Sequence, residues 1–247
     1  MISLLCAVKD RKDHLLRSLP SWSDVADEII IVDWGSEEAV SELVEVKQNE
    51  KVKTVQVNKN HAKFWTFSQS YNTAARFASG DYYIVMNADE IVIDSKSISS
   101  LERPNSEFFY EGTDWASDDA HGVYFLYIAK NEFWKINGYH EDIIGYGYDD
   151  VDLRNRLQES GLRLKVSGAK IKHIKHESHH ETRENALNCQ TAMSFPWSVN
   201  ERLIDLDVTD GEKVIYCDIA MRDRIKQYDI ITRNIKAAEL KDSFILE

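Results

Sequence analysis

The chain contains Glu28-Ile29-Ile30-Ile31-Val32-Asp33-Trp34-Gly35-Ser36, in which four consecutive apolar residues run into a polar turn. A short apolar run that ends at turn-forming residues predicts a strand buried on both faces. Three other segments of the first ninety residues have strand patterns: Met1–Val8, Val52–Val57 and Tyr82–Met86. We therefore predict four strands in this part of the chain, with residues 28–33 as the second.

Helical patterns separate these strands, over residues 12–19, 36–48 and 65–79. Ser36, followed by Glu37 and Glu38, is typical of a helix start, because a hydroxyl caps the first amides and acids favour the positive end of the helix dipole. Gly80 is expected to end the third helix in the left-handed conformation. Alternating strands and helices predict an α/β fold built on a parallel sheet.

Polar residues follow the predicted strands. They are Lys9-Asp10-Arg11, Asp33-Trp34-Gly35-Ser36 and Asn87-Ala88-Asp89-Glu90. Ligands of open α/β sheets bind at the carboxyl ends of the strands. We therefore expect these three groups to converge on one edge of the sheet.

The rest of the chain has a mixed pattern. Strands are predicted at 108–112, 123–129 and 163–174, a short helix at 131–136, and a helix at 149–160 that ends at Gly161. We predict one catalytic domain over residues 1–193, with a nucleotide-binding half (1–90) and an acceptor and metal half (91–193). Residues 194–247 have weak periodicity and are expected to form a small helical appendage.

Charge and hydropathy limit the functions of the 247-residue chain. Its formal net charge of −12 argues against a nucleic-acid partner. No apolar run reaches the length of about 18 residues that a membrane span needs, and charge follows the first eight residues too soon for a signal peptide. We expect a cytoplasmic protein, compatible with peripheral association at the inner membrane face. Three widely spaced cysteines predict neither a disulfide framework nor a zinc site.

An acidic block follows two glycines and two aromatics in Gly145-Tyr146-Gly147-Tyr148-Asp149-Asp150-Val151-Asp152. The glycines permit a tight backbone and the aromatic rings can pack against a sugar. A carboxylate at the mouth of such a loop is placed to take a proton from an acceptor hydroxyl. Simple decoration of a helix start by acids is the structural alternative.

This block, from Gly138 to Leu157, and His173-Ile174-Lys175-His176 resemble the nucleotide-sugar glycosyltransferases of the GT-A fold. The resemblance covers about residues 2–190. It is to the family 2 group, with a second half similar to the C-terminal region of β1,4-galactosyltransferase. It implies a Rossmann-like mixed central sheet flanked by helices. It also implies transfer of a sugar from a nucleotide-sugar donor, with UDP the expected nucleotide, to a glycan or lipid-linked acceptor hydroxyl. The expected outcome is inversion, but retaining relatives share the fold and a similar glycine-aromatic-acid block, so the stereochemistry stays open.

The resemblance also implies roles for individual residues. Asp150 stands at the general-base position and Asp149 beside it contacts the acceptor, although the two could be exchanged. Asp89 and His176 stand at the metal-ligand positions, and the donor set suits Mn²⁺ or Mg²⁺. Asn87 replaces the first acid of the family's Asp-x-Asp motif, so Asp89 alone supplies a carboxylate there.

Donor contacts are expected near the early strand ends. Asp33 resembles the acid that binds the base edge, Arg11 the basic residue after the first strand, and Trp34 is placed to flank the base or ribose. Asn72 and Arg76, one helical turn apart, are expected to face the donor. Trp115 and Trp134 are either core residues or sugar contacts.

Two other classes remain open from the sequence. A nucleotidyltransferase also uses acidic metal ligands, but it normally carries a glycine-rich phosphate loop that Lys9-Asp10-Arg11-Lys12 lacks. A non-catalytic carbohydrate-binding or scaffold protein on a decayed fold would explain Asn87. Bacterial relatives often act on surface polysaccharides or lipid-linked oligosaccharides, which suggests a role in bacterial polysaccharide biosynthesis.

Overall fold

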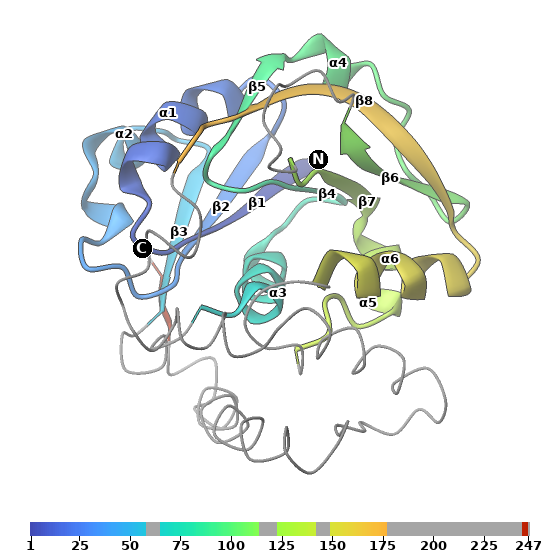
Figure 1. Ribbon diagram of the computed structural model, residues 1–247. Coiled ribbons are helices and arrows are strands. Elements are labelled where there is room, and N and C mark those ends of the chain that lie inside the picture. The colour runs from blue at the N-terminus through green and yellow to red at the C-terminus, as the bar shows by residue number, and fades with distance from the viewer. Residues whose placement is uncertain (58–64, 114–122, 142–148, 177–243, 247) are drawn as a thin grey trace.

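The computed structural model describes residues 1–57, 65–113, 123–141, 149–176 and 244–246 (Figure 1). Within them one sheet has the strand order β5-β8-β6-β7-β4-β1-β2-β3-β9. Its parallel part consists of β1 (Ile2–Val8), β2 (Glu28–Asp33), β3 (Val52–Val57) and β4 (Tyr82–Val85). These are the four strands that the apolar runs predicted.

The other half of the sheet is mixed. β7 (Leu126–Ala129) pairs antiparallel with β4, and β6 (Phe108–Thr113) pairs antiparallel with β7. β8 (Arg163–His173) lies parallel to β6, and β5 (Glu90–Asp94) pairs antiparallel with β8. The prediction of a mixed α/β sheet is therefore confirmed.

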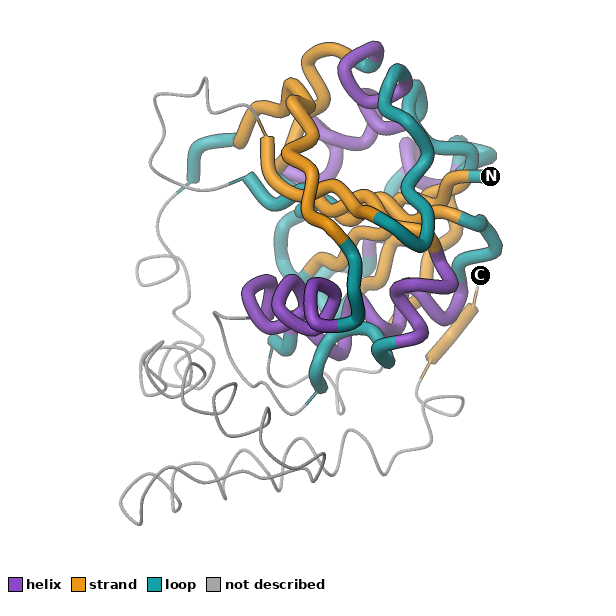
Figure 2. Tube along the Cα trace, turned by 90° about the vertical axis from the view of Figure 1, so that its right-hand side faces the viewer, coloured by secondary structure: helices purple, strands orange, loops and turns teal. Residues whose placement is uncertain are grey.

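Helices cover both faces of the sheet (Figure 2). They are α1 (Lys12–Trp22), α2 (Val44–Lys47), α3 (Phe67–Phe77), α4 (Lys96–Ser99), α5 (Lys130–Lys135) and α6 (Asp149–Glu159). Alternate residues of β1 face opposite cores: Leu4 and Cys6 pack with Trp22 of α1, whereas Leu5 packs with Tyr71 of α3. β1 and β2 are mostly apolar because both faces are covered, whereas apolar and polar residues alternate in β3.

Two local predictions were wrong. Residues 36–39 are not helical, and the predicted helix is reduced to a 3₁₀ turn at Val40–Glu42 and the short α2. Gly80 does not adopt a positive φ. It is needed for close approach instead, because a Cβ there would lie 2.5 Å from Ser3 Oγ and 2.9 Å from the carbonyl oxygen of Met1.

The sequence pattern also missed β5, whose apolar run is only three residues long. Near the C-terminus, Phe244–Leu246 form β9, which pairs antiparallel with β3, so the end of the expected helical appendage is a strand. Residues 194–243 lie outside the described part, and the division at residue 193 stays a prediction. No helix among the described residues is long and apolar enough to cross a membrane.

Candidate metal and sugar-transfer site

A carboxylate and two imidazoles meet where β4 passes into β5. β5 pairs antiparallel with β8 in a register that sets Glu90 opposite His173, and the Ile174 amide donates to the Asp89 carbonyl oxygen at 2.7 Å. Asp89 Oδ2 lies 3.0 Å from His176 Nε2 and 3.6 Å from His173 Nε2. The expected pair Asp89 and His176 is thus brought together, and His173 joins it.

The composition of this cluster suits a bound cation. Burial disfavours the charged form of Asp89, but its hydrogen bonds with His173 and His176 outweigh burial and hold the pKa of the carboxyl well below its usual range. One ligand atom from each of the three residues lies within 4.8 Å of the others. A carboxylate with two imidazoles is a donor set for a divalent transition metal such as Mn²⁺, so the residues fit the metal that the resemblance implied.

The expected convergence of the first strand ends is also observed. Asp10 has a φ of 53°, and its amide donates to Ser36 Oγ at 3.0 Å while its Oδ1 accepts the Glu37 amide at 2.7 Å. These bonds join the turns after β1 and β2 and hold Asp10 in the left-handed conformation. In α1, the next element along the chain, the ring of His14 contacts that of His176 edge-on, with centroids 5.4 Å apart.

Asn87 has a local reason to be an amide. Its Nδ2 donates to Glu90 Oε1 at 3.0 Å, its backbone amide donates to Glu90 Oε2 at 2.7 Å, and its Oδ1 accepts from the Tyr71 hydroxyl at 3.0 Å. Burial, together with the charge of Asp89, raises the pKa of the fully buried Glu90. An aspartate at position 87 would place another carboxylate against Glu90. The departure from the Asp-x-Asp pattern therefore stabilises the turn that carries Asp89.

Glu90 also links this turn to the rest of the site. Its Oε1 accepts the Tyr124 amide at 2.6 Å, and the hydroxyls of Tyr124 and Tyr139 lie 2.7 Å apart. Burial raises the pKa of both tyrosines, and the charge of Asp150 adds to the shift. Tyr124 therefore connects the metal side of the site with the side that carries the acidic helix.

Both residues expected to bind the nucleotide base are fully buried. Asp33 is fully buried, and its two carboxylate oxygens accept the amides of Ser36 (2.8 Å) and Val40 (3.0 Å). Trp34 is also fully buried, and its carbonyl oxygen accepts from Lys9 Nζ at 3.2 Å. These two residues order the turn after β2, and direct contact of either with a nucleotide base stays a prediction.

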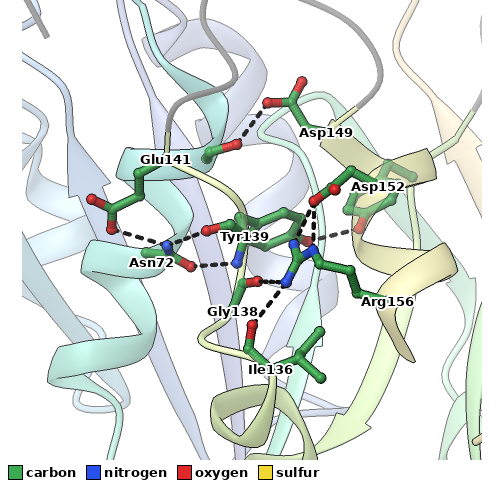
Figure 3. A network of polar contacts seen from close by, with 10 residues as sticks. Asn72, Ile136, Gly138, Tyr139, Glu141, Asp149, Asp152 and Arg156 are labelled. Atoms are coloured by element: carbon green, nitrogen blue, oxygen red, sulfur yellow. Dashed lines mark hydrogen bonds and ion pairs between the residues drawn. The ribbon is translucent and has the colours of Figure 1, made fainter. Parts of the chain in front are cut away.

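Figure 3 shows a polar network between α3 and α6. Asn72 Nδ2 donates to the Tyr139 carbonyl oxygen at 2.8 Å, and Asn72 Oδ1 accepts the Tyr139 amide at 2.9 Å. Asn72 and Arg76 both contact Glu141 Oε1, at 3.0 and 2.7 Å. In the structure both residues of α3 therefore hold the segment 139–141, and their expected contact with the donor stays a prediction.

The two candidate catalytic carboxylates have different surroundings in the structure. Asp149 is buried, and its Oδ1 accepts from Ser68 Oγ of α3 at 2.8 Å. The side chain of Asp150 is 43% exposed, and its nearest described cation, Arg154, lies 3.8 Å away. Asp149 thus anchors the start of α6, whereas Asp150 presents an accessible carboxylate.

The start of α6 has a second anchor in this view (Figure 3). Arg156 is ion-paired with the buried Asp152 at 2.5 Å, and its Nη1 donates to the carbonyl oxygens of Ile136 and Gly138 at 2.8 and 2.7 Å. Gly138 has a φ of 67° and lies so close to Asn72 that a Cβ would not fit. The segment before the acidic helix is therefore held from both sides.

Sequence reasoning missed His173, Glu90, Tyr124 and Ser68. The adjacent histidines made His173 ambiguous, although its spacing of three from His176 was visible. Glu90 was named only as part of the polar stretch after residue 86, and Tyr124 and Ser68 reach the site only through contacts between distant segments. Trp134 is partly buried and donates to the Tyr83 hydroxyl at 3.2 Å. Trp115 and residues 145–148 lie outside the described residues.

Comparisons with known proteins agree with this geometry. The model of glycosyl transferase family 2 matches residues 3–134, more than half of the chain, and a model described as the N-terminal domain of galactosyltransferase matches residues 118–180. No curated protein matches. Both parts of the resemblance inferred from the sequence are thereby confirmed.

Solved structures with the same fold include a mannosyltransferase and TarS. A mannosyltransferase from Pyrobaculum calidifontis in complex with GDP-Man and Mn²⁺ is 11% identical, with a TM-score of 0.59, over 98% of this chain and 86% of that one. TarS from S. aureus in complex with UDP-GlcNAc is 12% identical, with a TM-score of 0.56, over 91% of this chain and 70% of that one. At these identities the likeness establishes the GT-A fold.

Proposed function

The chain belongs to glycosyl transferase family 2 and is a glycosyltransferase, and from this we propose that it transfers a sugar from a nucleotide-sugar donor to a hydroxyl of a glycan or lipid-linked saccharide. UDP is the nucleotide that we propose, and Mn²⁺ or Mg²⁺ the metal. The nucleotidyltransferase and scaffold alternatives lose their support with the family match.

One observation carries the proposal: Asp89, His173 and His176 come from segments more than eighty residues apart and form one cluster at the end of β4. A strand-end acid that only formed a turn would not need two imidazoles around it, one of them buried. We propose these three residues as the metal ligands. A divalent cation bound there supplies positive charge that offsets the charge building on the departing diphosphate.

The acidic helix supplies the base. In the proposed reaction Asp150 takes the proton of the acceptor hydroxyl, the acceptor oxygen forms a bond to the anomeric carbon, and the bond to the nucleoside diphosphate breaks with inversion. Asp149 is held by Ser68 and cannot turn toward an acceptor without losing that bond. We therefore assign the base to Asp150 and an anchoring role to Asp149.

The donor side is proposed from the turns after β1 and β2. Arg11 precedes the first turn of α1, next to His14 and the metal cluster, where a cation is placed to contact the diphosphate. Asp33 and Trp34 shape the turn against which we propose the base and ribose bind. Asn87 supports Asp89 through Glu90.

Calorimetry with UDP tests the metal site directly. We expect UDP to bind at least tenfold more tightly with MnCl₂ than with EDTA, and Asp89→Ala to abolish that difference. Glu107→Ala is the matched control, because this acid is 69% exposed and precedes β6, which there pairs with Arg163 at the end of β8 opposite His173. An unchanged metal response in Asp89→Ala would remove Asp89 from the site.

Turnover tests the base. Nucleoside diphosphate release is measured with UDP-galactose, UDP-GlcNAc and GDP-mannose in the presence of MnCl₂. Asp150→Asn is expected to lower turnover by about 10²–10⁴-fold while UDP affinity is retained. Lost UDP affinity would instead place Asp150 on the donor side.

We also propose, from the resemblance alone, a cytoplasmic bacterial enzyme of polysaccharide biosynthesis that associates peripherally with the membrane.

A further inference from the structure

Asp150 lies beside an ion pair that the sugar-transfer chemistry does not itself require. Arg154 Nε donates to Glu111 Oε2 at 2.6 Å, and Arg154 Nη2 donates to Glu111 Oε1 at 3.1 Å. The same Nη2 lies 3.8 Å from Asp150 Oδ2. One guanidinium thus faces two carboxylates and binds only one of them.

The two carboxylates differ in burial. The Glu111 side chain, on β6, is 10% exposed, whereas that of Asp150 is 43% exposed. Burial raises the pKa of Glu111, and the two hydrogen bonds with Arg154 oppose that effect. A buried carboxylate without a cation is destabilised more than an exposed one. This explains why the guanidinium forms its two hydrogen bonds with Glu111.

The distance to Asp150 is informative because of the helical spacing. Residues four apart on a helix are neighbours, and an acid and an arginine at this spacing close to direct contact when nothing else holds them. A separation of 3.8 Å is longer than a hydrogen bond. The two hydrogen bonds with Glu111 therefore keep Arg154 close enough to orient the Asp150 carboxylate but too far away to form a hydrogen bond with the Asp150 oxygens.

We infer that Glu111 and Arg154 are positioning residues for Asp150: Glu111 holds the guanidinium back so that the Asp150 oxygens stay available for the acceptor proton. The inference rests on the proposed role of Asp150 as the base. Among the described residues no other cation is ion-paired with Asp150. Loss of Glu111 would release Arg154 onto Asp150 and block the base without touching the substrate.

The first experiment is a crystal structure of Glu111→Gln. The amide keeps the volume of the side chain, but its NH₂ group cannot accept from the guanidinium, so the fork loses one bond and its opposite charge. We expect Arg154 Nη2 to move within about 3.2 Å of Asp150 Oδ2. A guanidinium that stays at its present distance overturns the inference, and this readout needs no substrate.

Kinetics provide the second readout, with whichever of UDP-galactose, UDP-GlcNAc and GDP-mannose gives turnover. Glu111→Gln is expected to lower kcat about fivefold, the effect of a newly formed exposed ion pair on the base, with the KM for the nucleotide-sugar unchanged. The double variant Glu111→Gln/Arg154→Met removes the released cation and should return kcat to within about twofold of wild type. A double variant as slow as the single variant overturns the inference.

Two controls separate this inference from the proposed function. Glu107→Gln removes an exposed ion pair between the residue before β6 and Arg163 at the start of β8, and it should leave kcat unchanged. Asp150→Asn reports on the base itself. If Asp150→Asn retains turnover, the proposed function fails whatever Glu111→Gln does. If Asp150→Asn is inactive and Glu111→Gln has full kcat, only the positioning role is wrong.

Discussion

A buried carboxylate at the end of the sheet opposite the site makes the stability of the protein depend on pH. Glu28, at the start of β2, is 5% exposed. Its oxygens accept from Ser3 Oγ, from Lys53 Nζ, and from both the amide and the hydroxyl of Ser79. Burial opposes ionisation, but these four donors outweigh it and lower the pKa of Glu28 from 4.5 to about 2.

The sign and size of the effect follow from that shift. A carboxyl whose pKa is lower in the folded state adds stability above its unfolded pKa, and this stability is lost as the pH falls toward the folded pKa. A shift from 4.5 to about 2 corresponds to about 3 kcal/mol at pH 7, because each unit is worth about 1.36 kcal/mol. By the same relation about half of it remains at pH 3.

The measurement is urea unfolding of wild type and Glu28→Gln between pH 7 and pH 3. We expect the free-energy difference between the two proteins to be about 3 kcal/mol at pH 7 and to narrow by roughly half at pH 3. Glu42→Gln is the control, since its side chain is 64% exposed and its loss should cost under about 0.5 kcal/mol. A difference between wild type and Glu28→Gln that does not change with pH would refute the argument.

Three further variants test close packing in the sheet and around the site. Gly80→Ala should lower the free energy of unfolding by about 1–3 kcal/mol, because its Cβ meets Ser3 and backbone at under 3 Å; unaltered thermal unfolding would contradict this. Asn87→Asp should cost about 1–3 kcal/mol at pH 7 and less at pH 4, measured by urea unfolding, since it adds a carboxylate beside Glu90. Asn72→Ala should make the 139–141 segment exchange amide hydrogens faster, and equal exchange in wild type would show that the clamp is unimportant.

Much of the first half of the fold could be predicted from the sequence. The runs 28–33 and 52–57 coincide with β2 and β3, and the helix at 65–79 contains α3. An apolar run in β2 and an apolar/polar alternation in β3 are local patterns, and each is enough to identify its strand. The helix at 36–48 failed because Asp33 takes the amides of Ser36 and Val40, a contact that capping preferences do not anticipate.

The residue types of the candidate site could be predicted from the sequence, but the contacts of its individual residues could be predicted less well. Asp89 and His176 were identified by their place after predicted strands and by resemblance, and the structure brings them to 3.0 Å. Asn72 was expected at the donor, which stays a prediction; in the structure its amide matches the buried backbone N–H and carbonyl groups of Tyr139. Such matches depend on how two segments meet, which no local pattern records.

The sequence by itself determined the α/β alternation, the polar strand ends and the acidic start of α6, because each depends on neighbouring residues and their periodicity. Only the tertiary structure decided that His173 joins Asp89, that Ser68 ties down Asp149 and leaves Asp150 accessible, and that Glu111 takes Arg154. These partners are between 43 and 84 residues apart in the chain. Strand pairing and helix packing bring them together, and burial then decides which carboxylate each donor binds.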